Sequence, residues 1–263
     1  MDDGTRNEMS LKTATNLSSY LIEKAKNHKN FKYYSSKNRI EGILENHTVY
    51  LSTGSRWNDT TDSENFNNDQ LEYKNFGLCL SFSRSESVAM WMLYSRNLGC
   101  MIDYSSDVIR SILKTKTVKL GFFENDVFNE TEVLSDDKFR VSISDVIYYG
   151  KSKKGGEDTY YVRRSGESYD QCRKDAVDSL SFYKKTLPWY YENECRIVVS
   201  ISRKLLRNSK CDTVAIEFPE EYLDKLRERV YDSPNNKKGT YKPSALKNSI
   251  NWNLCKDCNK EIR

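Results

Sequence analysis

The segment GLCLSFSRSESVAMWMLYSRNLGCMIDY, Gly77–Tyr104, reads as a strand, a helix and a second strand in close succession. The apolar run that ends in hydroxyls, Leu78–Ser83, predicts a buried strand. Ser83 and Glu86 have the S-x-x-E spacing of a capping box, which predicts that a helix begins there. Apolar residues return at Cys100–Ile102 and predict another strand.

The predicted helix carries two aromatic side chains, Trp91 and Tyr94, beside a strand that ends in serines. Val88, Trp91, Met92 and Ser95 recur at helical spacing. This arrangement indicates one wall of a pocket. A core helix packed on a sheet is the commoner role for any single residue of this kind.

The bulk composition bounds the fold and the partners of the chain. Its 263 residues suffice for one large domain or two small ones. A hydrophobic fraction of 37% with a mean hydropathy of −0.78 indicates a polar surface around a core. The net charge of +4, from 42 basic and 38 acidic residues, is too balanced to indicate nucleic-acid binding by charge alone.

Cysteine usage and the N-terminus indicate a compartment. The seven cysteines are scattered and odd in number, which favours reduced, buried thiols over a disulfide framework. The first residues show neither the basic nor the apolar region of a signal peptide, and no stretch is apolar for long enough to span a membrane. We therefore expect a cytoplasmic protein without a membrane segment.

The order of predicted elements indicates an α+β fold with mixed, mostly antiparallel sheets and flanking helices. We expect a helical N-terminal extension over residues 1–30, a single α+β domain over residues 31–232 and a polar C-terminal tail over residues 233–263. Within the domain, the apolar stripe of Ser168–Lys185 predicts a second clear helix, and Asn125–Asp137 reads as an acidic connection.

A second feature is the segment Tyr190–Val199, in which Glu192 and Glu194 stand just before an apolar strand. A glutamate at the mouth of a sheet can accept a hydrogen bond from a ribose hydroxyl. It can also stabilise the positive charge that develops on a sugar in an oxocarbenium-like transition state. The alternative is that both carboxylates lie on the surface and pair with Arg196 or a nearby lysine.

Four motifs occur in one order along the chain, and they are Trp57-Asn58-Asp59, Ser81-Phe82-Ser83, the helix Met90–Ser95 followed by Gly99, and Trp189-x-Tyr191-Glu192-x-Glu194-x-Arg196. Together they resemble the bacterial family described as domain of unknown function 2971. The resemblance runs from about Phe31 to Val199. It implies a family but supplies no activity.

A second resemblance, to a different family, implies an activity. The chain has Lys32-Tyr33-Tyr34 before Ile43-Leu44, then Ser81-Phe82-Ser83, then Trp91 and Tyr94, and finally Glu192-Asn193-Glu194 before an apolar strand. This order is similar to that of the NAD-dependent ADP-ribosyltransferases, and its middle part looks like that of the poly-ADP-ribose polymerases. The resemblance implies an ADP-ribosyltransferase-like arrangement of the α+β fold.

The same resemblance implies roles for single residues. Glu194 would be the catalytic glutamate on the nicotinamide ribose, and Glu192 would orient the acceptor. The implied binding contacts are Ser81 or Ser83 to the glutamate and ribose, and Tyr94 or Trp91 to the nicotinamide ring.

The chain departs from the resemblance at its first strand. The ADP-ribosyltransferases carry Arg or His there, whereas this chain offers Lys32, Tyr33 and Tyr34. The resemblance therefore leaves Tyr34 and Arg56 as the expected cofactor contacts, with Arg39 as another residue that could take the part.

The expected function is an enzyme that cleaves NAD and transfers ADP-ribose to a protein or a nucleic acid, as a toxin or a phage-defence effector would. Two alternatives stay open. One is a binding or sensor module that holds a nucleotide or a nucleic-acid end without turnover. The other is a metal-dependent nuclease that uses Asp103 with the two glutamates. No metal is predicted, because Cys255 and Cys258 form only half of a zinc site.

Overall fold

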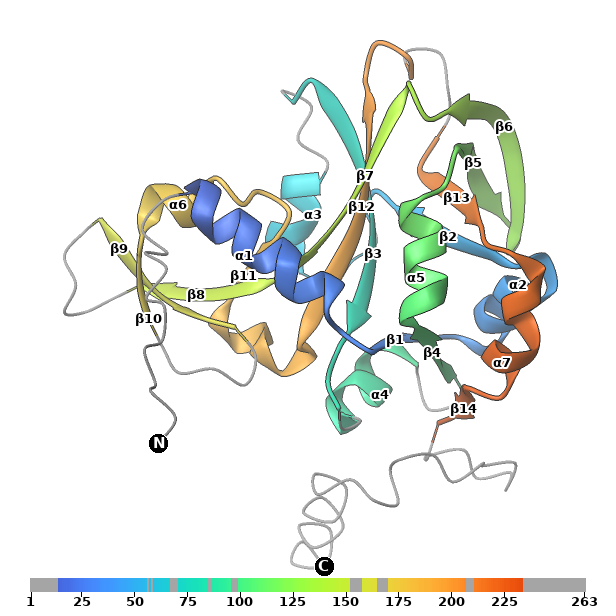
Figure 1. Cartoon of the computed structure of the whole chain (residues 1–263), viewed down its shortest axis with the longest axis horizontal. Helices are drawn as coiled ribbons and strands as arrows, with labels where there is room; N and C mark the ends of the chain where they lie inside the picture. Colours follow the sequence, from blue (N-terminus) through green and yellow to red (C-terminus); the bar gives the residue numbers. More distant parts are fainter. Residues whose placement is uncertain are drawn as a thin grey trace, which may run out of the picture.

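A computed structural model describes residues 14–55, 57, 59–66, 71–84, 87–95, 99–151, 158–164, 170–206 and 211–233. It confirms a mixed α+β fold with mostly antiparallel sheets (Figure 1). Among the strand pairs of the described residues, only β8 (Ile147–Lys151) and β11 (Lys184–Thr186) run parallel. No helix in this part of the chain is long and apolar enough to cross a membrane.

In the described part of the chain the larger sheet has ten strands. Eight follow the order β14-β4-β1-β3-β2-β13-β5-β6, while β12 pairs with β3 and with β7. Their bounds are β1 (Asn30–Ser35), β2 (Thr48–Ser52), β3 (Tyr73–Ser81), β4 (Cys100–Ser105), β5 (Thr117–Glu124), β6 (Val127–Ser135), β7 (Phe139–Asp145), β12 (Glu194–Ser202), β13 (Thr213–Glu217) and β14 (Val230–Asp232). β3 and β12 form its centre (Figure 1).

β3 is the point at which this sheet divides. On one side β12 pairs with β3 along its whole length, from Glu194 opposite Ser81 to Ser202 opposite Tyr73. On the other side, β1 reaches β3 only at Ser81 and β2 only at Gly77. Between these two points the described strands leave Leu78–Leu80 without a ladder partner on that side. The divergence of β1 from β2 thus opens a gap in the middle of the sheet.

Helices cover this sheet and close its core. They are α2 (Lys37–Asn46), α3 (Thr60–Phe66), α4 (Val88–Tyr94), α5 (Ser106–Leu113) and α7 (Leu223–Arg227), with the 3₁₀ helix η2 (Glu220–Tyr222) next to α7. A second 3₁₀ helix, η1 (Leu187–Glu192), contacts β8 and β11 instead. The core gathers alternate strand residues such as Leu78, Leu80, Ile197 and Val199. α5 adds Ile112 to that core, because its apolar stripe faces β4 and β7.

The smaller sheet has the order β10-β9-β8-β11, with β9 (Thr159–Arg163) and β10 (Asp170–Arg173). α1 (Ala14–Lys26) and α6 (Lys174–Asp178) lie side by side over it (Figure 1). Leu17 and Leu21 of α1 pack in its core with Ile147 and Val162, whereas Ala25 joins the larger core. The predicted N-terminal helix therefore packs against both sheets.

Residues 168–185 do not form the predicted helix. The described part contains β10, the short helix α6 and the strand β11 instead. Cys172, Ala176 and Leu180 are buried as their spacing indicated, but they pack against the smaller sheet from three different segments. Pairing of β10 with β9 and of β11 with β8 supplies backbone hydrogen bonds that replace those of a helix.

Two further predictions are wrong. The acidic connection 125–137 is mostly the strand β6, joined to β5 by a tight turn in which Asn125 and Asp126 have φ of 50° and 65°. Two left-handed residues are typical of a type I′ hairpin. The helix α4 begins at Val88, not at Ser83, and Ser87 is its cap, accepting the Met90 N–H at 3.4 Å.

Candidate functional site

A cavity of about 310 Å³ lies in the gap between β1 and β2. Its floor includes Leu78–Leu80 of β3, and its walls come from β1, β2, α2, α4 and the polar segment that leads into α3. Lys185 of β11, Glu192 at the end of η1 and Glu194 at the start of β12 close the far side. The cavity therefore joins segments from across the described chain.

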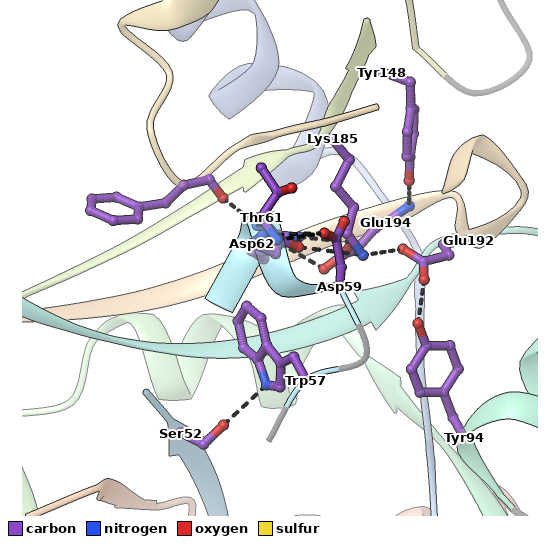
Figure 2. A network of polar contacts seen from close by, with 12 residues as sticks. Ser52, Trp57, Asp59, Thr61, Asp62, Tyr94, Tyr148, Lys185, Glu192 and Glu194 are labelled. Carbon is purple, nitrogen blue, oxygen red and sulfur yellow. Dashed lines mark hydrogen bonds and ion pairs between the residues drawn. The ribbon is translucent and has the colours of Figure 1, made fainter. Parts of the chain in front are cut away.

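The two glutamates reach the cavity from different elements. Glu192 is the last residue of η1, and β12 begins at Glu194. Asn193 between them is left-handed, with φ 48° and ψ 54°, and this turn ends the 3₁₀ helix. The Glu194 N–H donates to the buried Tyr148 hydroxyl at 2.9 Å, which fixes the start of the strand (Figure 2).

The glutamates belong to a buried network of charges. Lys185 Nζ lies 2.5 Å from Glu192 Oε2, 3.2 Å from Glu194 Oε2 and 3.4 Å from Asp62 Oδ2. Arg196 Nε donates to Glu194 Oε1 at 2.6 Å, and its two terminal nitrogens donate to the Asp62 carboxylate. All five side chains are at most 7% exposed. Three carboxylates thus face two cations, which leaves one carboxylate in excess.

That excess of negative charge gives the two glutamates different pKa values. Burial, and next the charge of Glu194, raise the pKa of Glu192 to about 7. Burial also acts to raise the pKa of Glu194, but Arg196 and Lys185 outweigh it and hold that pKa below its usual value. Burial acts to lower the pKa of Lys185, and its carboxylate neighbours, Glu194 first, raise it instead. Glu194 is therefore fixed as a carboxylate, whereas Glu192 can exchange a proton near neutral pH.

One interpretation of the sequence pairs Arg196 with surface carboxylates. The pairing is present, but Arg196 is fully buried. Asp62 and Lys185 were not singled out. Asp62 lies in α3, where Asp59 accepts the N–H groups of Thr61 and Asp62 at 3.0 and 3.3 Å and so starts the helix (Figure 2). The segment around Asp62 is polar and lacks regularly spaced apolar residues, so its sequence does not indicate that a carboxylate there is buried.

Aromatic side chains make up much of the cavity wall. The Tyr94 hydroxyl donates to Glu192 Oε1 (Figure 2). Tyr34 lines the same space from β1. Trp57 donates its Nε1–H to Ser52 Oγ at 3.2 Å. A methyl group on Gly77 would lie 2.9 Å from the Trp57 ring, so the absence of a side chain there admits the indole. The tryptophan of the polar loop lines the site.

The other predicted contacts are distributed unevenly. Ser81 is buried but does not line the cavity, and its Oγ accepts the Ser83 N–H at 3.5 Å. The Ser83 backbone carbonyl accepts a hydrogen bond from Lys32. Trp91 is fully buried against Tyr34, with ring centroids 5.0 Å apart, and does not line the cavity. A stacking contact of Trp91 with a ligand is therefore not supported.

Some predictions fall elsewhere or outside the described residues. Asp103, the third member of the nuclease alternative, does not line the cavity and instead accepts from Arg229 at 2.8 Å and from the Phe31 N–H at 3.1 Å. Arg56, Cys255 and Cys258 lie outside the described residues. Within the described part, no group of three His, Cys, Asp or Glu side chains is arranged to hold a metal ion.

Residues 31 to 199, over which the resemblances run, thus contain the cavity, the paired glutamates and the aromatic wall. The two resemblances themselves remain predictions. Comparison of the chain with known protein families, with curated proteins and with solved structures found no match.

Proposed function

We propose that this protein is an ADP-ribosyltransferase-like enzyme that cleaves NAD at the bond between nicotinamide and ribose. The observation that carries the proposal is the convergence of Glu192, Glu194 and Tyr94 on one cavity in a divided sheet. The volume of about 310 Å³ is at the lower end of the roughly 300–1,000 Å³ that small-molecule sites occupy. It suits the nicotinamide and its ribose rather than a whole dinucleotide.

In the proposed reaction the C1′–N bond breaks, and its electron pair leaves with nicotinamide, which departs neutral. The sugar takes on oxocarbenium character, and a fixed negative charge beside it lowers the energy of that state. Glu194 is the carboxylate that stays ionised, because Arg196 and Lys185 hold its pKa low. The same two cations also offset its charge, so Glu194 is expected to act mainly as a hydrogen-bond acceptor for a ribose hydroxyl.

Glu192 then takes the part of general base. The acceptor nucleophile attacks C1′ and loses its proton, and a carboxylate with a pKa of about 7 is well matched to receive that proton near neutral pH. Tyr94 and Lys185 hold the carboxylate in place through one oxygen each. Tyr34 and Tyr94 offer aromatic surfaces on which the nicotinamide ring can pack.

The test is nicotinamide release from NAD, with candidate protein and nucleic-acid acceptors, by the wild type and by Glu192→Gln and Glu194→Gln. General acid–base catalysis typically supplies about 10²–10⁴-fold, so each variant is expected to lose roughly 100-fold or more. Asp136→Asn is the control, because that carboxylate is exposed and pairs with Lys116 outside the cavity. Equal release by all four proteins, or none by the wild type with any acceptor, overturns the proposal.

A binding module without turnover gives a different result in the same assay. NAD would then raise the melting temperature of the wild type and of Glu192→Gln alike, with no nicotinamide released from either. The neutralisation of Glu194 by two cations is the observation that favours this second function.

A further inference from the structure

Arg39 stands at the boundary between the candidate site and a second hollow. It belongs to the first turns of α2 and lines the cavity that holds the glutamates. Together with Tyr50 it also lines a hollow of about 690 Å³ between α2, β2, β13 and the β5–β6 hairpin. A ligand that extends out of the cavity past Tyr50 therefore meets the Arg39 side chain.

The guanidinium of Arg39 is held by aromatic rings. Its Cζ lies 3.8 Å from the ring centroid of Phe123 and 4.5 Å from that of Tyr50. These two rings are themselves 5.0 Å apart, and Phe128 lies within 5.5 Å of both. Stacking of this kind orients the guanidinium plane and uses its faces, while leaving the N–H groups at its edge free to donate.

Those edge donors have no partner within the described residues. The Arg39 side chain donates no hydrogen bond there and forms no ion pair, although the backbone N–H of Arg39 helps to cap α2. The buried Arg196, in contrast, binds two carboxylates and a carbonyl. A permanently charged fork of donors that is oriented but unpaired matches the geometry of a phosphate group.

The surroundings limit how much negative charge can bind. Carboxylates of Glu41, Glu45, Glu130 and Glu217 line the second hollow. Lys119 pairs with two of them, at 3.5 Å to Glu130 and 2.6 Å to Glu217. A nucleic-acid strand that continued into this hollow would bring its phosphates against acidic side chains. A single phosphate or pyrophosphate at Arg39 avoids that repulsion.

We propose that Arg39 is the anchor of a phosphate-binding subsite, and that the ligand of the cavity is a phosphate-bearing nucleotide rather than a nucleoside or a nucleic-acid strand. The sugar to be cleaved lies at the glutamate end, and its phosphate or pyrophosphate lies against the edge of the guanidinium. The inference deepens the proposed function, on which the identity of the sugar rests, but the phosphate subsite is testable by binding alone.

The experiment is calorimetric titration of ADP-ribose, inorganic pyrophosphate and adenosine into wild type, Arg39→Gln and Arg39→Lys. Arg39→Gln is expected to weaken ADP-ribose and pyrophosphate at least tenfold and to leave any binding of adenosine unchanged. Arg39→Lys keeps the positive charge but loses the planar, bidentate guanidinium, so its affinity for the two phosphate compounds should fall less than that of Arg39→Gln. Arg110→Gln, an exposed arginine on α5 paired with Asp107, is the matched control and binds as wild type.

The inference is overturned if wild type binds neither phosphate compound, if Arg39→Gln binds both as well as wild type, or if the variant weakens adenosine equally. Phe123→Leu adds an internal check, because loss of the stacked ring should weaken ADP-ribose by less than loss of the guanidinium. These readouts need no turnover. Arg39-dependent binding without nicotinamide release would leave the phosphate subsite standing and remove only the proposed enzyme activity.

Discussion

Glu192 and Glu194 share one cavity but hold their protons differently. Glu194 is bound by Arg196 through two nitrogens, and its pKa lies below the usual value, whereas the pKa of Glu192 is raised to about 7. Together with Asp62 the two glutamates share only two cations, Lys185 and Arg196, so the excess negative charge falls on one glutamate. This inequality underlies the predictions that follow.

The raised pKa of Glu192 makes the stability of the protein depend on pH. Its folded pKa lies above the ordinary value of 4.5, so between these two values the folded state binds more protons than the unfolded state. The stabilisation from protonated Glu192 is complete below the ordinary value and is lost as the pH rises through about 7. Relative to Glu192→Gln, the wild type should become less stable from about pH 5 to about pH 8 in urea unfolding.

Glu194 should make stability depend on pH in the opposite direction. Because its folded pKa is lowered, its contribution is present above the ordinary value of 4.5 and fades as the pH falls below it. Urea unfolding of wild type and Glu194→Gln on both sides of that value measures the effect. Parallel pH curves for wild type and both variants would contradict the assignment of the two pKa shifts.

The Tyr94 hydroxyl should tune the proton on Glu192. It donates to the ionised carboxylate, so Tyr94→Phe removes a contact that lowers the pKa of Glu192. The variant should shift the pH dependence of nicotinamide release to higher pH and lose about 1 kcal/mol of stability. Tyr183→Phe is the control, because its hydroxyl contacts Ser142 Oγ at 2.8 Å and does not line the cavity. Identical pH profiles for the two variants would speak against a role for Tyr94.

Arg196 should be the most costly charge in the protein to remove. Arg196→Met leaves Asp62 and Glu194 buried without their guanidinium partner. Removal of one member of a buried ion pair costs roughly 3–5 kcal/mol, which urea unfolding can measure. Arg196→Lys keeps the positive charge but not the bidentate guanidinium, and it should lose less stability than Arg196→Met. Arg110→Met, at an exposed arginine, should stay within about 0.5 kcal/mol of wild type.

The left-handed turn at Asn193 should be needed to place Glu192. A β-branched side chain is strained at φ 48°, whereas glycine and asparagine adopt this conformation readily. Asn193→Val should lose about 1–2 kcal/mol of stability and most of the nicotinamide release. Asn193→Gly is the matched variant and should stay close to wild type in both measurements. Equal activity of the two variants would show that the turn does not position the carboxylate.

Much of the larger sheet could be predicted from local patterns. β1, β2, β5, β12 and β13 lie where apolar, β-branched and aromatic residues cluster. The strand order could not be predicted, because β3 pairs with β12 more than a hundred residues away in the chain and divides between β1 and β2 on its other edge. The prediction of one helix over residues 168–185 is wrong because apolar residues three to four apart also fit a strand, a short helix and a second strand that pack in the same core.

The residues that line the cavity could be predicted only in part. Tyr34, Tyr94, Glu192 and Glu194 do line one cavity. Lys185 and Asp62 were missed because a buried charge looks like a solvated one in a sequence, and only their partners from distant segments reveal the difference. The predicted ligand contact of Trp91 is not supported, because a tryptophan at helical spacing fits a core as well as a ligand site, and Trp91 packs in a core cluster.

The most direct test is single-turnover nicotinamide release at pH 7, with the protein in excess over NAD, which isolates bond cleavage from product release. Glu194→Gln and Glu192→Gln are compared with wild type and with Asp136→Asn at conditions where all four are folded. We predict release by wild type and Asp136→Asn, and at least 100-fold slower release by both cavity variants. Release that is equally fast in Glu194→Gln, Glu192→Gln and wild type would contradict the assignment of the cavity as the site of cleavage.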